Sequence, residues 1–423
     1  MAGRASQHRL QQTRENRGGR ASPLAVLLMI GATAGLGVVT AAFGLGRLWA
    51  EDDPERALRA WPWQVQAHLA LAASALSGAG ESPKPSLAES HGRQALAHAP
   101  LSVRAVSVLG QAAVLKGEAQ IADAMMQAAA RRSLRDAPSQ TWLFARALER
   151  RDYPAAMRAL DVLLRRRPEL IETLGPVLFP VLDAAPDARA ALAERLALAP
   201  TWRSALLASY SRAAAQPGFV YALHQSLRDG PTPPTDQEAG AYINRLVRDR
   251  AYVAALVAWQ QQRPRTDAGL MIDGGFEAEN SLPPFGWRLT AADGGAADII
   301  RSPAGEGRAL QATALGGLKR QGLAEQLLVL APGSYRLQGR LWREGKVSDG
   351  ALVWTLRCEN GPAIKTSQGP RASGEAGSPF SLTFTTPQGC PAQRLALETR
   401  PGASLSPTTV VYDDLKIELV GSR

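Results

Sequence analysis

The chain has 423 residues, which is too long for one ordinary domain and suits two or three. Its formal charge of +10 favours anionic partners such as phospholipid head groups or acidic polysaccharide. No DNA- or RNA-binding motif accompanies this charge, so we expect no nucleic-acid partner and place most arginines on solvated helix faces.

An uncharged apolar run extends over residues 23–46. Roughly 23 helical residues span the ~30 Å hydrocarbon core of a bilayer. Five arginines precede the run and an acidic cluster follows it, so the positive-inside rule leaves residues 1–22 in the cytoplasm as a basic tail. We predict a single transmembrane anchor over residues 23–49, with Trp49 at the interface. The bulk of the chain would then lie in the periplasm of a bacterial-type inner membrane.

The apolar run has two further interpretations. A cleaved signal peptide would also be apolar, but its hydrophobic stretch usually has only 7–15 residues. Gly31 and Gly35 form a GxxxG pattern inside the run, which either marks helix dimerisation or arises by chance in a span rich in alanine and glycine.

Residues 51–263 show helical periodicity that proline interrupts at intervals of 30 to 38 residues. A proline costs little at the start of a helix, because the N–H that it lacks would have no helical partner there. Turn sequences lie midway between the prolines, at residues 116–118 and 150–153. Each unit is therefore predicted to be a hairpin of two helices. The interrupting prolines are Pro62, Pro100, Pro138, Pro168 and Pro200.

The first units resemble the tetratricopeptide repeat. The residues that carry the resemblance are Leu109, Gly110, Ala113, Gly117, Ala124 and Pro138, and then Ala145, Asp152, Tyr153, Ala156 and Pro168. The resemblance implies a solenoid of stacked hairpins. Its surface would either bind a protein segment or act as a spacer. The basic runs at residues 131–135 and 165–167 are expected to be solvated, and residues 264–269 to form a linker.

Residues 270–423 change to alternating apolar and polar residues with Gly-Pro turns. Strands are predicted at 309–313, 324–329, 334–343, 351–358, 380–385, 394–399 and 410–419, which favours an antiparallel sandwich. The region resembles the galactose-binding-like jelly-roll fold of many carbohydrate-binding modules. The resemblance is carried by Asp273 to Glu277, Trp287, Gly307 to Leu310, Pro332 to Gly339 and Tyr412 to Ile417.

The jelly-roll resemblance implies a structural calcium ion, for which Asp273, Glu277 and Asp414 would supply oxygen ligands. The alternative is a turn aspartate and a glutamate that is solvated or paired with arginine. No other cofactor is expected. The two cysteines of the chain, Cys358 and Cys390, both lie in this region, and in an exported domain we expect them to form a disulfide.

Strand alternation places several polar side chains opposite the predicted core. Arginine, amide and carboxylate groups beside an aromatic ring are the mixture that a sugar site needs, and arginine favours an acidic sugar. The alternative is an ordinary solvent-facing sheet. The predicted glycan-binding residues are Arg336, Gln338, Arg340, Trp342, Arg357 and Glu398.

No motif of enzyme chemistry is present. The sequence contains no G-x-S-x-G elbow, no G-x-x-x-x-G-K-[ST] phosphate loop and no H-E-x-x-H zinc motif, so no catalytic residue is predicted. We therefore expect a multidomain, membrane-anchored adaptor: one transmembrane helix, an all-α repeat solenoid that engages a protein, and an all-β jelly-roll that engages a polysaccharide during cell-envelope or exopolysaccharide assembly or export. The alternative function is a non-catalytic membrane scaffold whose β domain binds only protein.

Overall fold

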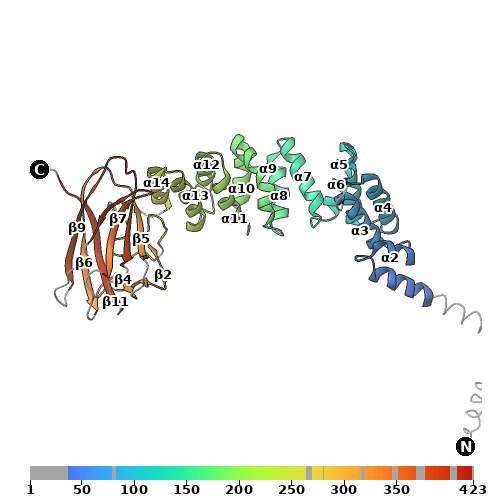
Figure 1. Cartoon of the computed structure of the whole chain (residues 1–423). Helices are drawn as coiled ribbons and strands as arrows, with labels where there is room; N and C mark the ends of the chain where they lie inside the picture. The colour runs from blue at the N-terminus through green and yellow to red at the C-terminus, as the bar shows by residue number, and fades with distance from the viewer. Residues whose placement is uncertain are drawn as a thin grey trace, which may run out of the picture. The chain divides into compact units, whose positions relative to one another are not determined.

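A helical region is followed along the chain by an antiparallel β-sandwich in the computed structural model of this protein (Figure 1). The structure describes residues 37–78, 82–262, 269–279, 281–315, 320–344, 351–367, 377–400 and 407–421. The predicted tail, most of the predicted anchor and the predicted linker up to residue 268 lie outside these residues. Among the helices within these ranges, none has the length and apolar character needed to cross a membrane.

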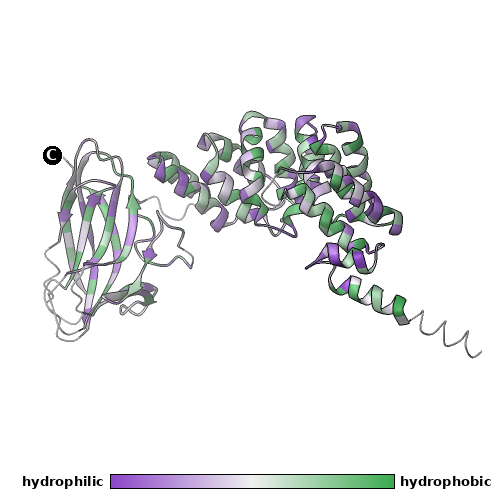
Figure 2. Cartoon of the chain, turned by 45° about the vertical axis from the view of Figure 1, so that its right-hand side comes forward, coloured by the Kyte–Doolittle hydropathy of each residue, from purple (hydrophilic) through white to green (hydrophobic). Residues whose placement is uncertain are grey.

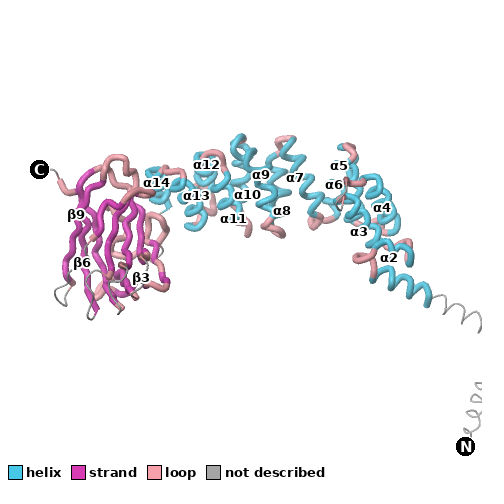
Figure 3. The backbone as a smooth tube through the Cα atoms, viewed as in Figure 1, coloured by secondary structure: helices cyan, strands magenta, loops and turns pink. Residues whose placement is uncertain are grey.

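The chain divides into two compact units, Met1–Leu163 and Leu164–Arg423. In the first unit, residues 37–48 are helical and short helices follow one another through tight turns (Figure 3). These helices are α2 (Pro54–Ala60), α3 (Val65–Ser77), α4 (Pro85–His98), α5 (Val103–Leu115), α6 (Ala119–Arg132), α7 (Ala137–Glu149) and α8 (Tyr153–Leu164).

Small residues let the helices of the first unit approach one another closely. A Cβ atom added at Gly92 of α4 would lie 3.0 Å from a methyl group of Leu109 on α5, and one added at Gly110 of α5 would lie 3.0 Å from the sulfur of Met126 on α6. Ala88, Ala105 and Ala122 are fully buried. The predicted helical hairpins are therefore confirmed, while membership of the tetratricopeptide repeat family stays a prediction.

The second unit begins with further helices, all short and connected by turns. They are α9 (Leu170–Ala184), α10 (Pro186–Leu196), α11 (Arg203–Ala213), α12 (Pro217–Arg228), α13 (Asp236–Arg248) and α14 (Tyr252–Gln262). Helix α9 continues through Pro176 and Pro180. The prolines that the sequence assigned to helix starts lie at or just before the first turns of α3, α5, α7, α9 and α11, as predicted.

Several arginines of the second unit bind helix ends instead of solvent. Arg189 donates to the carbonyls of Leu182 and Asp183 in the last turn of α9. Arg245 donates from Nη1 to three carbonyls at the end of α11, at 3.0 to 3.1 Å. A cation is favourable at a helix C-terminus because the last carbonyls there lack helical partners. The expectation that most arginines lie on solvated faces is therefore wrong for these residues, although Arg131, Arg132 and residues 165–167 are exposed as predicted.

The β region is a sandwich of two antiparallel sheets (Figure 1). The five-stranded sheet has the order β1-β5-β10-β7-β8 and the six-stranded sheet the order β2-β3-β4-β11-β6-β9. The strands are β1 (Arg288–Leu289), β2 (Ala291–Ala292), β3 (Gly295–Arg301), β4 (Arg308–Ala314), β5 (Gly322–Leu328), β6 (Gly333–Glu344), β7 (Leu352–Cys358), β8 (Ala363–Thr366), β9 (Ser378–Thr386), β10 (Gln393–Thr399) and β11 (Thr408–Leu419).

The core between the sheets is formed by alternate residues of the central strands, a pattern visible as alternating hydrophobic and hydrophilic bands in Figure 2. Trp354 lies at its centre, edge-on to Tyr412 with ring centroids 5.3 Å apart. The predicted disulfide is confirmed: Cys358 at the end of β7 is bonded to Cys390, with a Cα–Cα distance of 5.5 Å. The fold class predicted for this region, an all-β sandwich, is therefore correct.

Candidate functional site

The six predicted glycan-binding residues do not form one face. Arg336, Gln338, Arg340 and Trp342 all lie on β6, with their side chains on the face opposite the buried Tyr335, Leu337 and Leu341, as strand parity predicts. Arg357 on β7 and Glu398 on β10, however, belong to the other sheet. The single surface of the prediction is therefore wrong, because parity separates core from surface but does not say to which sheet a strand belongs.

Glu398 and Arg357 belong to a closed network on the five-stranded sheet. Glu398 is only 3% exposed, although it carries a carboxylate. It forms an ion pair with Arg357, accepts a hydrogen bond from the Thr355 hydroxyl at 3.0 Å and lies 3.7 Å from the Nε of Arg320. A buried carboxylate needs such partners to offset the loss of its hydration. These contacts occupy the Glu398 carboxylate, which is buried and therefore offers little to a ligand.

Two of the three predicted calcium ligands, Asp273 and Glu277, bind backbone N–H groups. Asp273 Oδ1 accepts hydrogen bonds from the backbone N–H groups of Glu277 and Ala278, and Glu277 Oε1 accepts one from the N–H of Arg308 at 2.8 Å. Asp414 is exposed and faces Arg340 at 4.0 Å. Within the described ranges, no group of three or more His, Cys, Asp or Glu side chains is arranged to hold a metal ion. These residues therefore do not fit a calcium site. Asp273 matches the turn aspartate of the alternative, whereas Glu277 binds the backbone N–H of Arg308 and not an arginine side chain.

A hollow opens on the sandwich where β11 bulges. The register of β11 against β6 shifts between Asp413 and Lys416, and Asp414 has a left-handed φ of 52°. Gly339 on β6 lies opposite, where an added Cβ would be 2.6 Å from a methyl group of Leu415 and 2.9 Å from the carbonyl oxygen of Asp413. The carbonyl of Gly274 accepts the N–H of Leu415 at 2.9 Å and holds the bulge from its other side.

The hollow has a volume of about 860 Å³ and mixed chemistry. Its polar lining comes from neighbouring strands: Gln338 pairs across the ladder with Ser381 on β9 and with Lys416 on β11. The Arg340 and Lys416 side chains are 54% and 60% exposed. The whole lining is Gly269, Met271, Gly274, Gly275, Gln338, Gly339, Arg340, Pro379, Phe380, Ser381, Asp414, Leu415 and Lys416.

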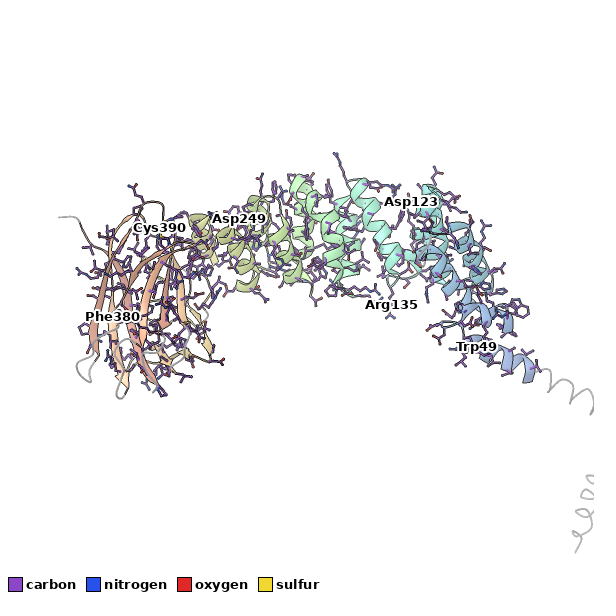
Figure 4. The ribbon with its side chains drawn as sticks, viewed as in Figure 1. Trp49, Asp123, Arg135, Asp249, Phe380 and Cys390 are labelled. Carbon is purple, nitrogen blue, oxygen red and sulfur yellow. A yellow bond between two sulfur atoms is a disulfide. The ribbon has the colours of Figure 1, made fainter. Side chains whose placement is uncertain are left out.

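Phe380 supplies the aromatic surface of the hollow; Figure 4 labels it on the strands of the sandwich. Its half-buried ring packs edge-on against Tyr412, with centroids 5.7 Å apart. Gly339, which pairs with Phe380 in the ladder, has no side chain to cover the ring. Trp342, the aromatic ring of the predicted sugar site, is half-buried and does not line the hollow; its ring lies against Gly377, just before β9.

The structure therefore keeps two of the predicted site residues, Gln338 and Arg340, and adds Phe380, Ser381 and Lys416. The added residues lie on β9 and β11, which flank β6 only through long-range pairing. The one local signal was the pair Asp413-Asp414, two consecutive acids that interrupt the alternation of β11, and it concerned that strand alone.

No family model and no curated protein matches this chain. Solved structures to which it is similar include several carbohydrate-binding modules. One is a family 61 module in complex with β-1,4-galactotriose, at 12% identity and a TM-score of 0.27, over 36% of this chain and all of that one. Another is a xylan-binding family 22 module from Paenibacillus barcinonensis, at 21% identity and a TM-score of 0.26, over 36% of this chain and 94% of that one. A third is a family 16 module, at 18% identity and a TM-score of 0.25, over 36% of this chain and 99% of that one.

Proposed function

We propose that the β-sandwich binds an acidic glycan in the hollow over β6, β9 and β11. The observation that carries the proposal is that one open hollow combines two exposed cations with an amide, a hydroxyl and an aromatic ring. Arg340 would form a charge-assisted hydrogen-bonded pair with a sugar carboxylate. Gln338 and Ser381 would bind hydroxyl groups, and the ring of Phe380 would contact the apolar C–H face of the sugar.

The glycan would be held by a protein that is itself fixed to a membrane. The uncharged run over residues 23–46, with its preceding arginines, supports an inner-membrane anchor and a periplasmic bulk. A non-catalytic adaptor in the assembly or export of a cell-envelope polysaccharide fits this arrangement. The sequence motifs that would support an enzyme are missing.

A second candidate function belongs to the helical region of the first unit. A hollow of about 550 Å³ is lined by α3, α5 and the start of α7. Leu69, Leu76 and Val108 give it an apolar floor, and Arg104 lies at its side. These features favour a protein segment with an apolar anchor and an acidic group, which corresponds to the scaffold function. Pull-down with Leu76→Asp and Arg104→Glu variants would test it separately from glycan binding.

The glycan proposal is tested with the full-length protein in detergent, by calorimetric titration against uronic-acid oligosaccharides and matched neutral ones. Arg340→Ala should weaken binding of the acidic sugar about tenfold, corresponding to about 1.4 kcal/mol, and of the neutral sugar less. Since this difference is electrostatic, it should shrink at high salt.

Arg336→Ala is the matched control, because Arg336 is exposed on the same strand and face but does not line the hollow. It should leave binding unchanged. Equal losses from the two variants would show a general attraction between a basic protein and an acidic polymer, and would overturn the site. No acidic glycan binding by the unaltered protein would leave the scaffold function in its place.

A further inference from the structure

The helix that continues the apolar run packs against the C-terminal end of α2. Gly46 in its last turn is buried, and a Cβ added there would lie 2.8 Å from the Cβ of Trp61 and 3.4 Å from the carbonyl oxygen of Ala57. Phe43, one turn earlier, meets Trp61 edge-on with ring centroids 5.9 Å apart. Gly46 and Phe43 thus form a notch for Trp61, which caps the end of α2.

A cluster of aromatic rings extends outward from this notch. Trp61 stacks edge-on with Trp63, with centroids 5.2 Å apart, and Trp63 is 58% exposed. Phe43 is 45% exposed. On the same stretch, Trp49, labelled in Figure 4, carries the Arg56 guanidinium 3.9 Å over its ring. We call Phe43, Trp61 and Trp63 the aromatic platform.

We propose that the aromatic platform lies in the head-group layer of the bilayer, so that α2 and the turn after it rest on the membrane surface. This inference rests on the proposed membrane anchor. The platform is continuous with the apolar run, because Phe43 belongs to the helix in which the run ends, Trp61 contacts that helix directly and Trp63 contacts Trp61. Tryptophan favours the interface because an apolar ring and a polar N–H suit a layer that is apolar on one side and wet on the other.

The charges around the platform indicate what kind of lipid it needs. Arg47, Arg56 and Arg59 are exposed nearby, and so are the four acids Glu51, Asp52, Asp53 and Glu55. The two signs nearly cancel, so anionic head groups gain little from this surface. Aromatic and apolar burial would therefore drive the contact, and a zwitterionic bilayer should suffice.

The experiment uses the full-length protein, labelled with 5-fluorotryptophan, in phosphatidylcholine nanodiscs that carry gadolinium-chelating head groups. Fluorine resonances are assigned by Trp61→Phe and Trp63→Phe variants. The Trp63 and Trp61 resonances should be broadened and lost in these nanodiscs, and should stay sharp in matched nanodiscs whose head groups chelate diamagnetic lutetium. Adding phosphatidylglycerol should not increase the broadening.

Two results would overturn the proposal, and neither is confused with failure of the anchor. If the protein is inserted and resists carbonate extraction but Trp63 stays sharp, the platform is not at the interface, although the anchor stands. If Trp63 broadens only with anionic lipid, electrostatic attraction explains the contact in place of aromatic burial. A protein that is extracted by carbonate would instead refute the anchor, and the platform with it.

Discussion

At the scale of single residues, His224 is the group whose titration should be most visible in stability. It lies on α12, only 5% exposed, and stacks on Tyr242 with ring centroids 5.4 Å apart. Burial lowers its pKa to about 4, against a smaller opposing effect of Glu238. Within the described structure its Nε2 has no hydrogen-bond partner, so no hydrogen bond stabilises a proton on that nitrogen.

The lowered pKa predicts loss of stability in acid. His224 is neutral in the folded chain, and the unfolded chain takes up its proton first. The stability it contributes is complete above pH 6.5 and is lost as the pH falls from 6.5 towards 4, by up to about 3 kcal/mol. Urea unfolding at pH 7.5 and 4.5 measures the loss. His224→Phe keeps the stacking but cannot titrate, so the pH dependence should shrink. His98→Gln, at an exposed histidine, should leave it intact.

Arg203 and Glu238 form a buried ion pair, so substitution of either residue alone should lower the free energy of unfolding strongly. Arg203 is 5% exposed and Glu238 3%, with 3.0 Å between Nη2 and Oε2. Arg203 also donates to the carbonyls of Leu196, Thr232 and Pro233. Removal of one partner leaves an uncompensated buried charge, so Arg203→Met should lower the free energy of unfolding by about 3–5 kcal/mol.

Arg212→Ala is the matched control for Arg203→Met in urea unfolding. Arg212 lies on the same helix, but its ion pair with Glu172 is exposed and 3.9 Å long. Its loss should cost less than about 1 kcal/mol. Similar effects of the two substitutions would show that the buried pair does not stabilise the helices.

At the scale of secondary-structure elements, the disulfide should stabilise the sandwich because it lowers the conformational entropy of the unfolded chain. It joins the end of β7 to the turn before β10, two strands that already pair in register. Closing a loop of this length removes about 3–4 kcal/mol of unfolded-state entropy in the chain-entropy model. Reductant should lower the melting temperature of the sandwich, and the Cys358→Ser, Cys390→Ser double variant should melt at that lower temperature with or without reductant. A melt that is indifferent to reductant in the unaltered protein would contradict this.

The elements show how far the sequence could predict the site. The sequence correctly assigned the side chains of β6 to two faces, because residues i and i+2 of a strand share a face whichever strand lies beside it. The mistake came with Arg357 and Glu398, since the choice of sheet depends on the long-range order of the strands. Strand β3 was missed because Gly295, Ala296 and Ala297 give no alternation that a pattern can detect. Phe380 was read as part of a strand, and only its pairing with Gly339 puts it beside the hollow.

At the scale of the whole molecule, the change of composition near residue 269 does not divide the folded units. Along the chain, the boundary between the two compact units falls between Leu163 and Leu164. The second unit contains helices as well as the sandwich. Trp259 on α14 donates from its indole to the carbonyl of Leu282 at 2.6 Å, and its ring lies near Phe285. The last helices are therefore joined to the β region by a buried contact.

This contact predicts that the helices before the sandwich raise its stability. A fragment of residues 236–423 should melt at a higher temperature than one of residues 269–423. Within the longer fragment, Trp259→Ala should lose about 3 kcal/mol or more, as large core truncations do. Trp259→Phe, which keeps the ring and loses the indole N–H, should lose about 1 kcal/mol. Equal melting of the two fragments would show that the sandwich folds without the helices.

The arginine contacts with helix ends have a consequence for comparing related sequences. Arg245 reaches α11 through backbone carbonyls, which every residue type carries. A substitution at the positions that carry these carbonyls therefore needs no matching change at residue 245. The residues in this contact are not expected to covary. Arg203 and Glu238, joined side chain to side chain, should change together. Spatial restraints derived from covariation would thus recover the contact between residues 203 and 238 and miss the one that Arg245 makes.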